Sequence, residues 1–192
     1  MKMMEWVENK KRKDFKEKIF GFDEKSIDSV LKFHKSLPNY EKTPLIELKE
    51  LAKYCGVRNI WLKDESKRFG LNAFKVLGAY YEIGKYLSEV LNEDISKLPF
   101  SVLPAKQIKK KLGNLTFITA TDGNHGRGVA WVAKCLQQNS IVYMPKGSSQ
   151  MRLKAIQDEG ADASITDLNY DDAVRLANKK AMENNWIMIQ DT

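Results

Sequence analysis

Residues 61–80 read Trp-Leu-Lys-Asp-Glu-Ser-Lys-Arg-Phe-Gly-Leu-Asn-Ala-Phe-Lys-Val-Leu-Gly-Ala-Tyr, and the rest of the chain is organised around them. Apolar Ile60 and Leu62 alternate with polar neighbours, which predicts a short strand over residues 59–63. A polar loop follows and turns at Gly70, and a helix is expected from Asn72, a favourable N-cap residue. Three- and four-residue spacing gives this helix an apolar side, made of Phe74, Leu77, Tyr81, Gly84, Leu87 and Leu91.

Lys75 falls in the first turn of this helix, directly after the glycine loop. The amino-terminal end of a helix carries partial positive charge, so this position disfavours the ammonium form of lysine and favours the free amine. A free amine is the form that attacks a carbonyl group to give a Schiff base. The alternative is a solvated lysine without chemistry, which is the usual fate of this residue type.

From residue 115 onward, strands and helices are expected to alternate. The strands are predicted at 115–120, 140–144, 163–166 and 186–190, and the helices at 126–137, up to 159, and at 171–183. This alternation predicts an α/β fold with an open parallel sheet and flanking helices. Ligands of such sheets bind at the carboxyl ends of the strands, which places residues 121–126, residues 145–149 and Asp191 on one rim.

Residues 121–128, Thr-Asp-Gly-Asn-His-Gly-Arg-Gly, form the expected turn between the first of these strands and its helix. Glycines let the backbone approach a ligand closely, and the first amides of the helix can hold an anion. The glycine order differs from the dinucleotide fingerprint and no phosphate-loop motif occurs, so a nucleotide site is disfavoured. A hydrolase triad built on Asp122 and His125 is also disfavoured, because no serine elbow accompanies them.

The segment Lys-Asp-Glu-Ser-Lys-Arg-Phe-Gly-Leu-Asn-Ala-Phe-Lys resembles the cofactor-lysine segment of fold-type II pyridoxal-phosphate enzymes, and more specifically that of their diaminopropionate ammonia-lyases. The loop at 121–126 resembles the Ser/Thr-x-Gly-Asn-His loop of the same family. The resemblance implies an incomplete tryptophan synthase β-like fold, in which Lys75 holds pyridoxal 5'-phosphate and Asn124 hydrogen-bonds the ring hydroxyl oxygen of the cofactor. It also implies that the substrate binds at Thr121, Asp122, Gly123, Asn124 and His125.

Asp122 stands where most of the family has a small neutral residue, and diaminopropionate ammonia-lyases show the same departure. An acid at this position suits a substrate with a second ammonium group. The resemblance therefore implies a carbon-nitrogen lyase of amino-acid catabolism that converts 2,3-diaminopropionate to pyruvate and ammonia by α,β-elimination. Lys75 or Asp122 would remove the Cα proton, with Asp191 as a further acid on the same rim. A serine or threonine dehydratase-like β-eliminase is the alternative among enzymes.

The resemblance runs from about residue 43 to residue 192 and covers the first half of the family's length. Family members continue with a glycine-rich loop for the cofactor phosphate, and no such run follows Lys75. A truncated or split member is therefore expected, whose full-length form is a homodimer. Residues 1–72 would form an N-terminal arm and part of the large cofactor domain, and residues 73–192 the smaller α/β domain. A non-catalytic fragment that pairs with a separate second half is the alternative from a different class.

Composition and charge restrict the partners. The formal net charge of +7 permits contact with nucleic acid or a membrane without requiring it. The basic run at residues 10–13 lies close to acids and lacks an aromatic platform, so a solvated arm is expected, with no nucleic acid and no membrane as partner. No secretory signal, membrane-length apolar stretch or metal-ligand spacing is found, which favours a cytoplasmic protein with no metal and with reduced Cys55 and Cys135.

Three further segments carry expectations about structure without chemistry. A helix is expected over residues 22–37, in which His34 has a structural role. A second helix is expected over residues 48–54 and ends at Gly56. Residues 92–114 are too polar for the core and are expected to form a surface loop with a short helix.

Overall fold

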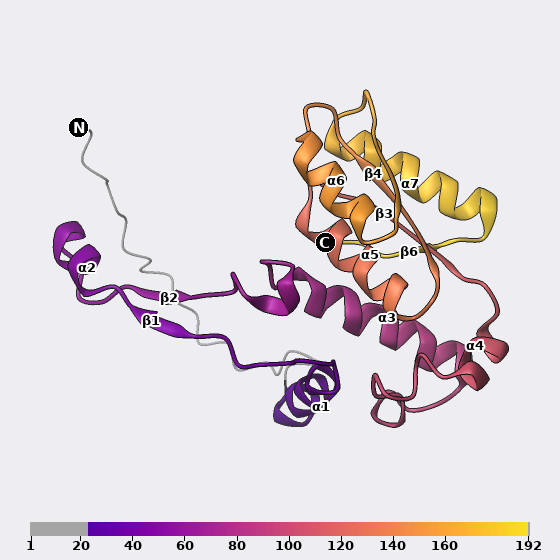
Figure 1. Ribbon diagram of the computed structural model, residues 1–192, viewed down its shortest axis with the longest axis horizontal. Helices are drawn as coiled ribbons and strands as arrows, with labels where there is room; N and C mark the ends of the chain where they lie inside the picture. The colour runs from indigo at the N-terminus through magenta and orange to yellow at the C-terminus, as the bar shows by residue number, and fades with distance from the viewer. Residues whose placement is uncertain (1–22, 192) are drawn as a thin grey trace, which may run out of the picture.

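The computed structural model of this protein describes residues 23–191 and contains a four-stranded parallel sheet in the order β5–β4–β3–β6 (Figure 1). The strands are β3 (Thr116–Ala120), β4 (Asn139–Met144), β5 (Asp162–Ile165) and β6 (Ile187–Met188). The predicted α/β fold with an open parallel sheet and flanking helices is confirmed, although the last strand is shorter than expected. The predicted basic arm before residue 21 lies outside the described residues.

Helices cover both faces of the sheet because successive side chains of β3 point to opposite sides. Phe117 packs on one face with residues of α5 (Asn124–Cys135), whereas Ile118 faces α7 (Tyr170–Asn184) on the other. Three alanines of α7, at positions 173, 177 and 181, share the core with Ile118 and let this helix lie close to the sheet. The edge strand β5 is covered by α6 (Gln150–Asp158).

Helix α3 (Lys75–Leu91) packs along α5 and joins the sheet to the N-terminal elements (Figure 1). Its buried side includes Tyr80, on whose ring the ring of Phe33 from α1 (Glu24–Lys35) stacks at 4.2 Å. A Cβ atom at Gly84 would lie 2.3 Å from the same Phe33 ring, so only glycine permits this contact.

The sequence-based description of α3 is wrong in two respects. The helix begins at Lys75, and Asn72 lies before it in the left-handed region at a φ of 58°, so Asn72 is not the N-cap. Phe74 is 60% exposed and does not belong to the apolar side. The helix has more apolar residues than one side can hold, and contact with α5 and α1 selects the side that is fully buried, made of Val76, Tyr80, Ile83 and Leu87.

Strands β1 (Leu45–Glu47) and β2 (Trp61–Lys63) pair antiparallel and are connected through α2 (Lys49–Cys55). We call residues 45–63 the hairpin arm. Gly56 ends α2 in the left-handed conformation at a φ of 66°, as the sequence predicts. The hairpin arm extends away from the four-stranded sheet and its helices (Figure 1).

Residues 92–114 form an irregular segment that contains the short helices η2 (Ile95–Lys97) and α4 (Lys106–Leu112). The expectation that this segment is too polar for the core is wrong for Leu98 and Leu103. Both side chains are buried in the core that also contains Phe33 and Tyr80. His34 has the structural role that was expected, because its Nε2 donates a hydrogen bond to the carbonyl oxygen of Leu77 at 2.9 Å.

Among residues 23–191, no helix combines the length and the apolar character that are needed to cross a lipid bilayer. Both cysteines are free thiols, as predicted, with Cys55 exposed and Cys135 half-buried. Burial raises the pKa of the Cys135 thiol, which makes it a poor nucleophile.

Candidate active site

The side chain of Lys75 lies at the amino-terminal end of α3 and meets Asp191, which follows β6. Lys75 Nζ forms an ion pair with Asp191 Oδ2, between residues 116 positions apart in the sequence. The Lys75 side chain is 36% exposed and that of Asp191 is 19% exposed, so the pair stands at the wall of an open space.

His125 lies behind this pair and is almost fully buried. Its Nε2 donates a hydrogen bond to the carbonyl oxygen of Ile189 at 3.1 Å, and its Nδ1 lies 3.6 Å from Asp191 Oδ1. Burial lowers the pKa of His125, while the Ile189 carbonyl and the Asp191 carboxylate act in the opposite direction. The neutral imidazole therefore keeps its proton on Nε2 and presents an unprotonated Nδ1 toward Asp191.

A cavity of about 530 Å³ opens in front of Lys75, and its lining includes His125, Gln190 and Asp191. Its floor on α3 includes two small residues, Gly78 and Ala79, beside the larger Leu77. A Cβ atom at Gly78 would meet no other atom within 4 Å, so this glycine leaves the floor open.

Glu82 lines the same cavity, two helical turns after Lys75. Its carboxylate accepts a hydrogen bond from the backbone amide of Gln190 at 3.4 Å, and burial raises its pKa. The cavity thus contains an amine at one end and a partly desolvated carboxyl group at the other.

Two glycines of the loop at 121–128 explain how this loop comes close to Lys75. A Cβ atom at Gly128 would lie 2.9 Å from the backbone Cα of Val76, so glycine lets α5 approach the first turn of α3. A Cβ atom at Gly126 would lie 2.3 Å from the Thr121 side chain, which folds under the loop. Thr121 Oγ1 also accepts a hydrogen bond from the amide of Gly123 at 3.0 Å.

Two further predicted residues of the loop, Gly123 and Asn124, lie at a neighbouring hollow of about 180 Å³ that Arg152 also lines, whereas Asp122 lines neither this hollow nor the cavity in front of Lys75. The side chains of Asp122 and Asn124 are exposed. Arg152 Nη1 donates a hydrogen bond to the backbone carbonyl of Asp122 at 3.2 Å. The structure thus brings Lys75, His125 and Asp191 together, and it places Gly123 and Asn124 on the adjoining hollow.

The segment that leads into Lys75 is fixed on both sides. The ring of Phe69 stacks on that of Trp131 in α5 at 5.5 Å, and Phe69 has a left-handed φ of 50°. Arg127 Nη1 donates a hydrogen bond to the carbonyl oxygen of Leu71 at 3.3 Å, while the same guanidinium pairs with Glu159 at 3.0 Å. These contacts set the point at which α3 begins.

Sequence reasoning missed Glu82 and Tyr170, and it gave Arg127 no role. Glu82 follows Lys75 by seven residues, a spacing that puts both on one side of a helix and that could have revealed it. Tyr170 is the first residue of α7, and its pKa is raised by burial and then by the negative charge of Asp191. No local sequence signal connects Tyr170 with Lys75.

The predicted effect of the helix terminus on Lys75 meets an opposing effect in the structure. Lys75 is the first residue of α3, so its side chain starts at the partially positive end of this helix. Asp191 places a carboxylate against the amine, and an ion pair of this kind stabilises the ammonium form. The sequence could not reveal this partner, because Asp191 comes from the far end of the chain.

Comparison with known proteins gives the context for this arrangement. Residues 37–192 match the family model described as pyridoxal-phosphate dependent enzyme. Diaminopropionate ammonia-lyase of Salmonella typhimurium is 55% identical over 163 residues, which cover 85% of this chain and 40% of that protein. The enzyme of the same name from Escherichia coli K12 is 48% identical over 172 residues, which cover 89% of this chain and 42% of that protein.

Solved structures agree with the sequence comparison. The apo crystal structure of the Escherichia coli diaminopropionate ammonia lyase superimposes with a TM-score of 0.83 at 47% identity, over 92% of this chain and 47% of that one. The biosynthetic L-threonine dehydratase of Haemophilus influenzae is more distant, at 30% identity over 147 residues, which cover 77% of this chain and 24% of that protein. The chain therefore spans less than half the length of the curated relatives it matches.

Proposed function

The chain belongs to the family of pyridoxal-phosphate dependent enzymes, and on that premise we propose that it is the amino-terminal part of a lyase that converts 2,3-diaminopropionate to pyruvate and ammonia. The net reaction consumes one water and releases both amino groups as ammonia. The identities of 48–55% with diaminopropionate ammonia-lyases support this substrate over the hydroxy amino acids of the more distant threonine dehydratase. The observation that carries the proposal is the amine of Lys75 at an open cavity, paired with Asp191.

The residues around this cavity fit the aldehyde end of pyridoxal 5'-phosphate. A primary amine reaches the cavity from a fixed helix terminus, and about 530 Å³ of space lies in front of it. Lys75 would hold the cofactor, and Asn124 would bind the ring hydroxyl oxygen. When bound, the cofactor stores the electron pair that proton removal leaves at the substrate Cα.

The roles of the side chains follow from their positions. Lys75 Nζ, once freed, accepts the Cα proton, and Asp191 orients this amine and stabilises its protonated form. His125 lies behind Asp191 with its Nε2 proton donated to the Ile189 carbonyl oxygen, and we assign it no role as a base. Asp122, on the exposed loop, attracts the second ammonium group of the substrate and is a candidate base for one enantiomer.

The substrate carboxylate is assigned to the loop at 121–125, where Thr121, Gly123 and His125 stand with Asp122 and Asn124. Backbone amides at the start of α5 are suitable donors for an anion. Thr121 is buried and holds the amide of Gly123, so its role is to shape the loop.

We also propose that residues 1–72 and 73–192 contribute to different domains of a homodimeric enzyme. The separate two-stranded and four-stranded sheets support this division. The stacking of Phe33 on Tyr80 joins the two parts through a common core.

Borohydride reduction tests the proposal directly. The purified chain is mixed with pyridoxal 5'-phosphate, reduced and digested, and the modified peptide is mapped by mass spectrometry. We expect the label on Lys75, its loss in Lys75→Arg, and its retention in the control Lys85→Arg on the same helix. A label on another lysine would contradict the assignment, and the lack of any label would favour a non-catalytic fragment.

A titration with pyridoxal and with its phosphate addresses the missing phosphate contacts. Charge-assisted hydrogen bonds contribute roughly 1.5–3 kcal/mol each. We expect similar, weak affinities for both compounds, since the glycine-rich phosphate loop of the family is not found after Lys75. A preference for the phosphate of several orders of magnitude would mean that this chain contains a phosphate site.

A further inference from the structure

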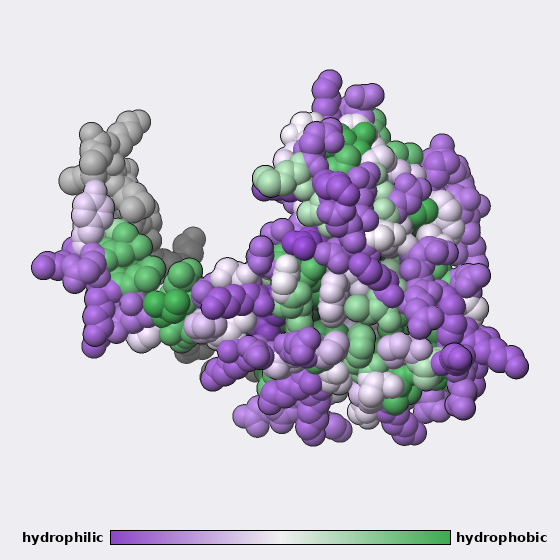
Figure 2. Space-filling model, in the orientation of Figure 1, coloured by the Kyte–Doolittle hydropathy of each residue, from purple (hydrophilic) through white to green (hydrophobic). Residues whose placement is uncertain are grey.

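The turn that leads into Lys75 contains three residues in the left-handed backbone region. The hairpin arm projects from the rest of the molecule (Figure 2), and the chain returns from it to α3 through residues 64–74. In this segment Phe69, Gly70 and Asn72 have φ angles of 50°, 72° and 58°. Glycine adopts this region freely and asparagine tolerates it, whereas a bulky aromatic residue is an outlier there. Phe69 is therefore the strained residue of the turn, and its contacts must hold it in place.

Two contacts of its ring hold Phe69. The ring stacks on that of Trp131 in α5, with centroids 5.5 Å apart and an interplanar angle of 24°. The guanidinium carbon of Arg68 lies 5.7 Å from the centroid of the Phe69 ring and 5.3 Å from that of the Tyr40 ring, and both distances are within the range of cation–π attraction. Phe69 thus contacts an aromatic ring of α5 and a positive charge of its own turn.

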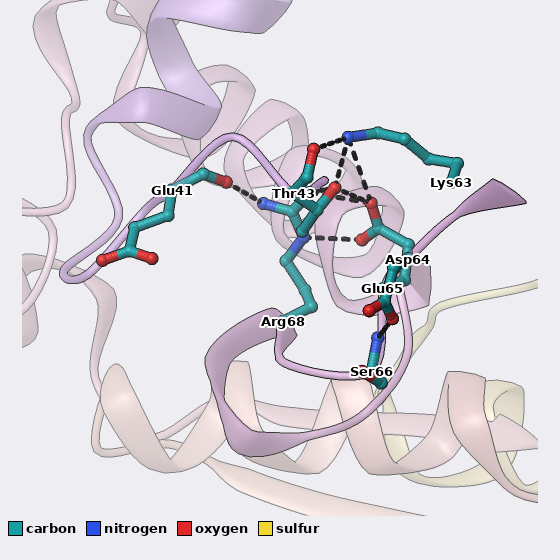
Figure 3. A network of polar contacts seen from close by, with 7 residues as sticks. All are labelled: Glu41, Thr43, Lys63, Asp64, Glu65, Ser66 and Arg68. Carbon is teal, nitrogen blue, oxygen red and sulfur yellow. Dashed lines mark hydrogen bonds and ion pairs between the residues drawn. The ribbon is translucent and has the colours of Figure 1, made fainter. Parts of the chain in front are cut away.

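A network of hydrogen bonds fixes this positive charge, and the side chain of Arg68 is only 5% exposed (Figure 3). Its Nε and Nη2 donate to the two carboxylate oxygens of Glu65 at 2.7 and 3.0 Å. Nη2 also donates to Thr43 Oγ1 at 3.1 Å, and Nη1 donates to the carbonyl oxygen of Glu41 at 2.7 Å. Because arginine cannot lose its proton in a protein, these partners hold a permanent charge beside the ring of Phe69.

The same turn determines where α3 begins. The amide of Leu71 donates a hydrogen bond to the carbonyl oxygen of Arg68 at 2.8 Å, and the side chain of Leu71 is buried in the core. Lys75 then opens α3, and its amine meets Asp191. A return of Phe69 to the ordinary backbone region would redirect the residues that follow it, Lys75 included.

We propose that Phe69 is a positioning residue for Lys75: Trp131 and Arg68 hold it in a strained conformation that places the Lys75 amine against Asp191. This proposal rests on the proposed function, in which that amine reacts with an aldehyde. Phe69 does not line the cavity in front of Lys75, so it acts through the backbone. Strained residues of this kind persist only where their surroundings over-determine them, and they cluster at reactive sites.

The test measures the reactivity of the Lys75 amine without the cofactor. The 192-residue chain is treated with formaldehyde and cyanoborohydride, and mass spectrometry gives the methylation rate of each lysine, with Lys85 on the same helix as the internal reference. The unchanged chain, Phe69→Leu, Asp191→Asn and the double variant form a double-mutant cycle. Leucine keeps an apolar side chain at position 69 and removes both the stacking and the cation–π contact.

We expect Asp191→Asn to increase the methylation rate of Lys75 several-fold in the unchanged chain and by less than about twofold in the Phe69→Leu background. The reason is that an amine that is no longer held against the carboxylate cannot respond to the loss of its charge. Equal factors in the two backgrounds would overturn the proposal, because they would show that the turn does not place the amine. An Asp191→Asn substitution that has no effect in the unchanged chain would overturn it as well.

Further variants separate positioning from a general loss of packing. Phe69→Tyr keeps the ring and should restore the full response to Asp191→Asn. Trp131→Leu and Arg68→Met each remove one contact that holds the ring and should reduce the response, so the test stands even if Phe69→Leu does not fold. Phe100→Leu removes another half-buried ring of the same core and should leave the response unchanged. A reduced response in Phe100→Leu would overturn the proposal, because any loss of core packing would then suffice.

Borohydride labelling with pyridoxal 5'-phosphate in the same samples reports on the proposed function separately. A cofactor label on a lysine other than Lys75 would contradict the proposed function, while the response of Lys75 to Asp191→Asn would still report on its position. A cofactor label on Lys75 together with equal Asp191→Asn factors in the unchanged chain and in Phe69→Leu would contradict the positioning role alone.

Discussion

The amine of Lys75 and the carboxylate of Asp191 form an ion pair that connects the first residue of α3 with the segment after β6. The parallel sheet makes this contact possible, because β6 lies next to β3 and delivers Asp191 to the edge where the loop at 121–128 begins. His125 Nδ1 lies 3.6 Å from the other carboxylate oxygen of Asp191, so the buried imidazole and the Lys75 amine stand on two sides of this carboxylate.

Asp191→Asn should increase the rate at which Lys75 reacts with pyridoxal 5'-phosphate at neutral pH several-fold. The carboxylate stabilises the ammonium ion, whereas the free amine is the nucleophile. Visible absorbance followed by borohydride mapping gives the rate. Asp158→Asn serves as the control, because Asp158 forms a comparable but exposed pair with Lys154. A slower reaction would show that Asp191 acts mainly by orienting the amine.

Gly128→Ala and Gly78→Ala should change stability in opposite directions. A Cβ atom at Gly128 meets the backbone of Val76 at 2.9 Å, which cannot give way locally, so we expect a loss of about 1–3 kcal/mol. The same change at Gly78 meets no atom within 4 Å and should stabilise α3 by about 0.5–1 kcal/mol. Urea unfolding of both variants measures the free energies, and a neutral Gly128→Ala would contradict the close approach of α5 to α3.

Arg68→Met should lower the free energy of unfolding by about 2–4 kcal/mol. The substitution leaves Glu65 and the carbonyl oxygen of Glu41 without their donor in a mostly buried place. The pKa of Glu65 is lowered chiefly by its hydrogen bond from Arg68, so the pair is ionised in the folded protein. Arg68→Lys should recover part of the loss, because lysine restores the charge without the bidentate geometry. Arg152→Met, at an exposed arginine, is the matched control.

The free energy of unfolding should fall as the pH decreases from 7 to about 5.5. Burial lowers the pKa of both His34 and His125 below the ordinary value of 6.5. Below pH 6.5 these histidines bind protons in the unfolded chain but stay neutral in the folded chain. Their contribution to the free energy of unfolding is therefore fully present above pH 6.5 and is lost as the pH falls below it, by up to about 1.4 kcal/mol per pH unit for each histidine. Glu82 opposes this trend, because its pKa is raised and its charged form is disfavoured in the folded state.

Urea unfolding at several pH values checks this prediction, and His34→Gln should make the dependence shallower. Glu82→Gln should stabilise the protein at pH 7 and have less effect near pH 4, where the carboxyl group is protonated in both states. A pH dependence that is unchanged in His34→Gln would mean that this histidine titrates in the folded protein as it does in the unfolded chain.

The sheet could be predicted from the sequence because the residues that mark each strand and its flanking turns are neighbours in the chain. Each strand from residue 115 onward is bounded by turn residues, and Asn169 caps α7 with its side chain. The start of α3 could not be predicted in the same way. Contacts of Phe69 with Trp131 and of Leu71 with Arg127 fix that point, and both partners lie more than one element away. Tertiary contact therefore overrode the capping preference of Asn72.

The candidate site shows the same division between local and distant information. Lys75 and the loop at 121–126 carry motifs that can be read in one stretch. Glu82 carries none, and it reaches the cavity because it lies two helical turns after Lys75 on α3. The buried Leu98 and Leu103 could not be recognised, because each precedes a proline in an irregular segment where no helix or strand periodicity marks a buried side.

Asp122→Ala should reduce activity on diaminopropionate more than on serine. Only the diamino substrate has a second ammonium group, and a carboxylate beside that group attracts it electrostatically. The side chain of Asp122 is exposed on the loop and has no ion-pair partner among residues 23–191, so its charge is available to a ligand. The enzyme to assay is a longer chain, in which these 192 residues continue with the part of the Salmonella typhimurium enzyme that follows the matched region. Steady-state kcat/KM is measured on both enantiomers of diaminopropionate and on serine, with Asp191→Ala measured in parallel. We expect the fall in kcat/KM caused by Asp122→Ala to be at least about tenfold larger for diaminopropionate than for serine.

If Asp122 is also the base for one enantiomer, kcat falls selectively for that enantiomer of diaminopropionate. Equal losses on all substrates would show that Asp122 only maintains the loop, and the diamino-specific site would have to be abandoned.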